Sequence, residues 1–150
     1  IRATPPGLSL RSYDHRLGSS PIGLYAADLL PLSEADYPRC LHGQPLLLPS
    51  DDSPVRAQLM DWFEQQRLVP RVVGEFDDTA LMKTFARAGA GVFPAPIAIR
   101  DEIDHAYGSR LLGLAGVIEE SYFAISTERR VSHPGVRAMI DNAESTLATP

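Results

Sequence analysis

The chain has 150 residues, which is enough for one domain or for two small lobes. Its formal net charge of −5 excludes a module that grips DNA through a basic surface of its own. A single cysteine rules out an intrachain disulfide and gives no sign of a cysteine-based zinc site, and no apolar run is long enough to cross a membrane.

The first half of the chain opens with strands and then alternates strands with helices. Residues 8–13 alternate in polarity and residues 21–26 are apolar, so both segments predict strands, with no helix between them. Residues 31–38 predict a polar link bounded by prolines. Residues 45–48 predict a short buried strand that Pro49 ends.

A first β–α–β unit is predicted over residues 45–75. Ser53 caps the helix and Pro54 takes its first position. Residues 71–75 form the next strand. The inner face of the helix is predicted to carry Val55, Leu59, Trp62, Phe63 and Gln66.

A second unit is predicted over residues 72–93. The β-branched pair at 72–73 suits a buried strand, and Asp77 or Asp78 caps the following helix. Gly89 and Gly91 end that helix before an apolar strand at 92–93. Its recurring apolar positions are Leu81, Phe85 and Ala88. Two such units predict an α/β fold with a parallel sheet.

The last third predicts two helices and two strands. A helix after Pro96 ends at Gly108, strands cover 110–114 and 121–126, and a final helix follows residues 132–134. The faces of the two helices carry Ile99, Ile103 and Tyr107 in the first, and Val136, Met139 and Ile140 in the second.

This order of elements resembles the effector-binding domain of LysR-type transcriptional regulators. The resemblance covers nearly all of residues 8–145. It rests on the buried Pro45–Pro49 segment, on Arg56 near the start of its helix, on Gly91-Val92-Phe93-Pro94 and on His133-Pro134. Within the family, the segments most similar to activators of sodium/proton antiporter genes are residues 74–78, 80–83, 93–96 and 128–130.

The resemblance implies a two-lobed fold like that of type 2 periplasmic binding proteins, with mixed, mostly parallel sheets flanked by helices. It implies an incomplete first lobe made of residues 1–22 and 123–150, and a second lobe at 23–122. It also implies a cytoplasmic homo-oligomer with no membrane partner. Promoter DNA is then bound through an N-terminal region of the parent protein that this fragment lacks, and RNA polymerase is a further expected partner.

The resemblance places the effector between the lobes, near the loops that follow the strands. The expected contacts are Ser50, Asp51, Ser53, Arg56, Glu75, Phe76, Asp77, Asp78, Thr79, Phe93 and Pro94. Because acids gather in these loops, we expect a small cation such as sodium, held in part by Glu75, Asp77 and Asp78, rather than an anion. No other cofactor is expected.

Each of these residues also has a purely structural interpretation. Ser53, Asp77 and Asp78 suit helix caps, Phe93 suits the core, and Arg56 suits a brace for the acidic loops. No catalytic residue is indicated, because the four histidines are scattered and no nucleophile accompanies the acidic residues. A transport solute-binding protein and an interaction domain without a ligand remain the alternatives.

Overall fold

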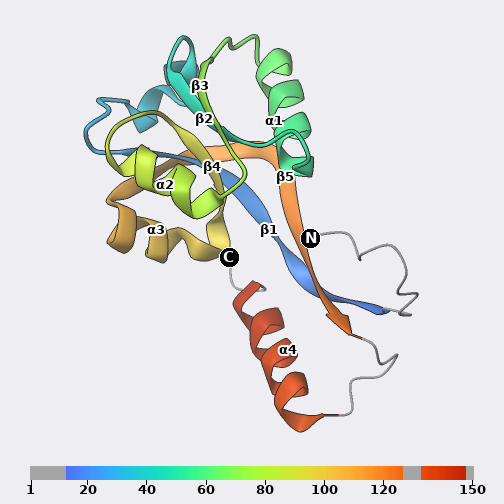
Figure 1. The fold of residues 1–150 in the computed structure, drawn as a ribbon. Coiled ribbons are helices and arrows are strands. Elements are labelled where there is room, and N and C mark those ends of the chain that lie inside the picture. Colours follow the sequence, from blue (N-terminus) through green and yellow to red (C-terminus); the bar gives the residue numbers. More distant parts are fainter. Residues whose placement is uncertain (1–12, 127–132, 148–150) are drawn as a thin grey trace. The chain divides into compact units, whose positions relative to one another are not determined.

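The computed structural model describes residues 13–126 and 133–147. The chain divides into two compact units (Figure 1). The larger unit spans Ser20–Glu120, and the described part of the smaller one comprises residues 13–19, 121–126 and 133–147. No helix in the described residues is long and apolar enough to cross a membrane.

Two long strands run from one unit into the other. Strand β1 (Tyr13–Ala27) lies between β4 (Phe93–Pro96) and β5 (Ser109–Ser126) in a three-stranded sheet. The prediction of separate strands at 110–114 and 121–126 is wrong, because the chain stays extended between them as one strand. The predicted strand at 21–26 is the end of β1, and the one at 8–13 lies outside the described residues apart from Tyr13.

The first β–α–β unit is confirmed. Strands β2 (Pro45–Pro49) and β3 (Arg71–Phe76) pair in parallel, and helix α1 (Pro54–Gln65) connects them. Four of the five predicted inner positions of α1 are buried, whereas Gln66 is the exposed C-cap residue. Val72 and Val73 are not buried as predicted, being 40% and 46% exposed, because β3 has β2 as its only strand partner in the described chain.

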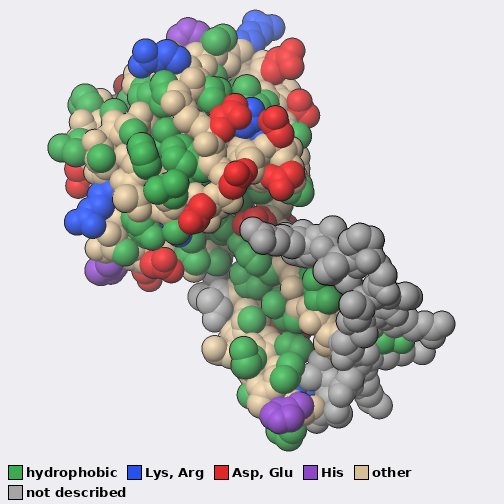
Figure 2. Space-filling model, viewed as in Figure 1, with side chains coloured by type: hydrophobic (Ala, Val, Ile, Leu, Met, Phe, Trp, Pro, Cys, Tyr) green, Lys and Arg blue, Asp and Glu red, His purple; other side chains and the backbone are tan. Residues whose placement is uncertain are grey.

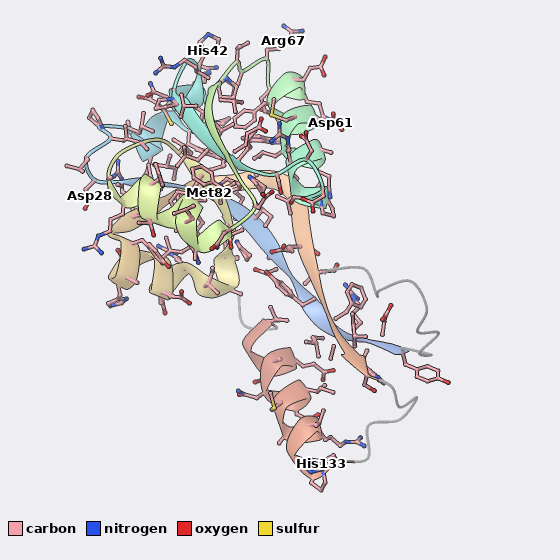
Figure 3. All side chains as sticks on the ribbon, viewed as in Figure 1. Asp28, His42, Asp61, Arg67, Met82 and His133 are labelled. Atoms are coloured by element: carbon pink, nitrogen blue, oxygen red, sulfur yellow. The ribbon has the colours of Figure 1, made fainter. Side chains whose placement is uncertain are left out.

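The second unit is parallel over a single bridge. Val92 bridges Leu46 in parallel, and its carbonyl accepts the N–H of Leu47 at 2.8 Å. The chain then leaves this sheet, and β4 pairs antiparallel with β1. Helix α2 (Thr79–Arg87) buries Met82 (Figure 3) and Ala86. The predicted inner face of this helix is therefore wrong, because Leu81, Phe85 and Ala88 are exposed.

The core of the larger unit consists of two clusters. One lies around α1, where the Trp62 and Phe63 rings meet edge to face with centroids 5.1 Å apart. The other lies around α2, where Phe93 stacks on Tyr25 with centroids 5.6 Å apart. The parallel pair β2–β3 is thus anchored from both faces, which fixes the loops at its carboxyl end.

The remaining helices are short or lie at the chain end. Three 3₁₀ turns cover Glu34–Asp36 (η1), Arg39–Leu41 (η2) and Ile97–Ile99 (η3). Helix α3 (Arg100–Tyr107) buries Ile103 and ends, as predicted, at Gly108, whose φ of 54° suits glycine. Helix α4 (Pro134–Leu147) follows His133, with Val136 and Met139 exposed.

Candidate functional site

The loops after β2 and β3 meet at one edge of the sheet, as expected for parallel strands. The last residues of the two strands pair, Pro49 with Phe76, and the Ser50 N–H donates to the Phe76 carbonyl oxygen at 2.9 Å. Helices α1 and α2 both begin at this edge. The carboxylates of these two loops form what we call the acidic rim: Asp51, Asp52, Glu75, Asp77 and Asp78. Figure 2 shows acidic side chains gathered on the side of the larger unit where α1 lies.

Arg56, in the first turn of α1, connects the two loops. Its Nε lies 2.8 Å from Oδ1 of Asp51, and its Nη2 lies 2.7 Å from Oε1 of Glu75. Its Nη1 donates to the Pro49 carbonyl oxygen at 3.0 Å. The hydrogen bond from Arg56 lowers the pKa of the Glu75 carboxyl, and the same bond raises the pKa of the guanidinium. Arg56 therefore acts as the brace that the sequence allowed for.

Asp78 caps α2, whereas Asp77 and Thr79 do not. Its side chain accepts the Ala80 N–H at 2.8 Å. Asp77 and Thr79 are exposed, and Asp77 is not the cap. Ser53 is the N-cap residue of α1 but its side chain makes no capping hydrogen bond. The cap interpretation thus holds fully for Asp78 alone.

The three remaining predicted contacts are packed to different degrees. Phe76 is half-buried and its ring lies 5.4 Å from that of Phe85 between centroids. Phe93 is fully buried against Tyr25, which confirms its interpretation as a core residue. Pro94 is buried within β4, opposite Leu24 of β1. The exposed part of the candidate site is therefore the pair of loops after β2 and β3.

The five carboxylates of the acidic rim outnumber the one guanidinium, that of Arg56, that pairs with them. Asp52 accepts a hydrogen bond from the Ser50 hydroxyl at 2.7 Å. Asp52, Asp77 and Asp78 have no ion-pair partner among the described residues. Within the same residues, no three or more Asp, Glu, His and Cys side chains are grouped so as to hold a metal ion. The negative charge disfavours an anionic ligand here even though two helix N-termini point to this edge.

The single cysteine is a poor nucleophile. Cys40 is half-buried, and desolvation followed by the nearby charge of Asp36 raises the pKa of its thiol. Both effects keep the sulfur protonated near neutral pH. Cys40 therefore gives no support to an enzymatic function.

The chain is similar to known regulators over most of its length. The family described as LysR substrate binding domain matches residues 1–148. "Transcriptional activator protein NhaR" of Escherichia coli (strain K12) is 32% identical over 138 residues, which are 90% of this chain and 44% of that protein. The chain therefore spans less than half the length of this curated relative.

Solved structures of regulatory domains share the fold. The bromide-bound regulatory domain of HypT from Salmonella typhimurium has a TM-score of 0.66 at 20% identity, over 91% of this chain and 66% of that one. The effector domain of AmpR from Pseudomonas aeruginosa has a TM-score of 0.63 at 20% identity, over 91% and 65%. At this identity the similarity establishes the fold and no ligand.

Proposed function

The chain belongs to the LysR substrate binding domain family, and we propose that it is the effector-sensing regulatory domain of a bacterial transcriptional activator that controls sodium/proton antiporter genes. The observation that carries this proposal is the 32% identity to NhaR over 90% of the chain. The same family match speaks against the solute-binding protein of a transport system and against catalysis.

The proposed effector is a small cation that contacts the acidic rim. Asp52, Asp77 and Asp78 lack ion-pair partners among the described residues, so their charge is available to a cation. Glu75 is held by Arg56, and a cation that used it would compete with the guanidinium. Hard cations such as Na⁺ suit carboxylate and carbonyl oxygens. The wider set of proposed effector contacts comprises the predicted residues from Ser50 to Thr79, whereas Phe93 and Pro94 are buried.

The effector acts by shifting an equilibrium between two conformations of the domain, and this shift changes the position of the DNA-binding region of the parent protein. In this proposal the parent protein works in the cytoplasm as a homo-oligomer. It binds promoter DNA through its N-terminal region and contacts RNA polymerase when it activates transcription. The cation changes the equilibrium only by the difference between its affinities for the two states.

A reporter assay tests the proposal. Cells that carry or lack the gene for this protein receive a reporter driven by an antiporter promoter of the same organism, with NaCl compared with KCl at equal ionic strength. We expect sodium-specific induction that needs the gene. The Asp78→Asn variant keeps a good cap residue and removes the charge, so it should respond more weakly to sodium. Induction without the gene would refute the regulatory role, and an unchanged response of Asp78→Asn would remove Asp78 from the site.

A further inference from the structure

Helix α2 and the end of strand β3 expose an apolar surface, of which only Phe76 is also among the expected effector contacts. This surface consists of Phe76 at the end of β3 and of Leu81 and Phe85 on α2, and we call it the apolar stripe. Leu81 and Phe85 are each 49% exposed, and Phe76 is half-buried. Figure 2 shows hydrophobic side chains gathered on the face over α2. Isolated exposed apolar residues are ordinary, whereas contiguous ones mark interaction surfaces.

Local geometry makes the stripe continuous. Gly74 and Phe76 pair with Leu47 and Pro49 of β2, after an irregularity in the register, so these two residues share one face of β3. A Cβ on Gly74 would lie 2.9 Å from the Phe76 ring, so the absent side chain lets this ring fold back along the strand. The ring also contacts Phe85, and Leu81 lies one helical turn before Phe85.

The stripe is separate from the face of α2 that packs into the core. The inner face of the helix is already occupied by Met82 and Ala86, which are 2% and 0% exposed. Lys83, on the same helix, is held against α3 by the Tyr107 ring, 5.0 Å away, and by Glu102 at 4.0 Å. α2 therefore has a second apolar face beyond the one that its fold requires.

Negative charge borders the stripe where β3 runs into α2. Glu75, Asp77 and Asp78 flank Phe76 in the sequence, and neither aspartate has an ion-pair partner among the described residues. We propose that the apolar stripe docks a basic amphipathic helix of a partner protein. Apolar side chains of that helix pack on Leu81 and Phe85, and its Lys or Arg side chains lie toward the acidic carboxylates.

A helical partner fits this surface better than an extended one. Leu81 and Phe85 form a ridge at i, i+4 spacing, and such ridges pack into the grooves of a second helix laid alongside. Asp77 and Asp78 lie at the N-terminal end of α2, so basic residues of the partner belong at one end of its apolar face. This places charge contacts at the rim and apolar contacts at the centre, as in ordinary interfaces.

The test uses a labelled model peptide and the intact chain. A helical peptide of about 15 residues, with Leu on one face and Lys on the other, is titrated with the chain and followed by fluorescence anisotropy. A peptide of the same composition in shuffled order is the control. The buffer contains KCl and no sodium, so the result does not depend on the proposed cation response. We expect the chain to bind the amphipathic peptide and not the shuffled one.

Variants of the chain show whether the stripe is the binding surface. Phe85→Ser and Leu81→Gln should each weaken binding about tenfold, because central apolar contacts carry most of the affinity. Leu29→Gln is the matched control, since Leu29 is 71% exposed and lies outside the stripe. Because the replaced side chains are half-exposed, the Tm of each variant should be close to that of the wild type. If Phe85→Ser does not fold, Leu81→Gln alone provides the test.

Several results would overturn the proposal. Equal binding of the two peptides, or equal binding by wild type and both stripe variants, would show that the stripe is not the docking surface. An affinity that is the same at about 50 mM and about 500 mM KCl would refute the basic character of the partner. If the chain self-associates and Leu81→Gln makes it monomeric, the stripe is covered by a second copy and not by a partner helix.

Discussion

Replacing Asp78 separates its role as a helix cap from its role as a charge. Asp78 accepts the Ala80 N–H at 2.8 Å, and the helix that it caps places Met82 and Ala86 in the core. Loss of such a cap costs about 1 kcal/mol of the free energy of unfolding. For a chain of this size that corresponds to a fall in Tm of about 3 °C. We therefore expect Asp78→Ala to melt about 3 °C below the wild type.

Asp78→Ser is the matched control for this prediction. Serine caps a helix about as well as aspartate, so in KCl this variant should melt within about 1 °C of the wild type. Differential scanning calorimetry on the three chains measures the effect. If Asp78→Ala melts like the wild type, the cap adds nothing to stability and the reasoning fails. If Asp78→Ser melts as low as Asp78→Ala, charge and not cap geometry is what stabilises α2.

Three further predictions use thermal melts. In the wild type, ionised Glu75 stabilises the fold through Arg56, and this stabilisation is lost as pH falls through the lowered pKa of Glu75. The Tm of Arg56→Met should therefore fall less than that of the wild type between about pH 5 and about pH 3. An equal fall in Tm would count against the brace. Tyr25→Phe should resist alkali better than the wild type, since burial raises the pKa of Tyr25 from 10.0 to about 12 and stability is lost as pH rises through that interval; equal alkaline midpoints would contradict this. Gly116→Ala should lower Tm more than Gly43→Ala, because both have positive φ but only at Gly116 would a Cβ meet the indole ring, at 2.8 Å; equal losses would show that the ring yields.

The parallel β2–α1–β3 unit could be predicted because local signals agreed. Pro49 and the Ser53-Pro54 pair mark the boundaries, and the spacing of Val55 and Leu59 gives the buried face. The face of α2 could not be predicted in the same way. Apolar residues lie on two sides of this helix, and the packing of Met82 and Ala86 against the sheets decides which side is buried. The choice depends on tertiary contacts that periodicity does not contain.

Polar contacts between residues far apart in the chain could not be predicted from the sequence either. The brace from Arg56 to Glu75 spans 19 positions, and the sequence supports it only as one of two interpretations of Arg56. The sequence gives no sign of the role of Arg110. This residue donates to the carbonyl oxygens of Leu30 and Leu32 at 3.3 and 2.7 Å and pairs with Asp28 at 3.0 Å. It thereby fixes the segment after β1. An arginine in a strand gives no local signal of partners about 80 positions away.

The measurement that tests the central proposal most directly is a thermal melt of the chain in NaCl and in KCl at equal ionic strength. Equal ionic strength cancels general screening, so a difference reports specific binding. A sodium site at tenfold its Kd adds about 1.4 kcal/mol, which raises Tm by several degrees. The account predicts a higher Tm in NaCl that Asp78→Asn reduces. Equal midpoints in the two salts would contradict a sodium-binding acidic rim and leave its aspartates as caps and surface charges.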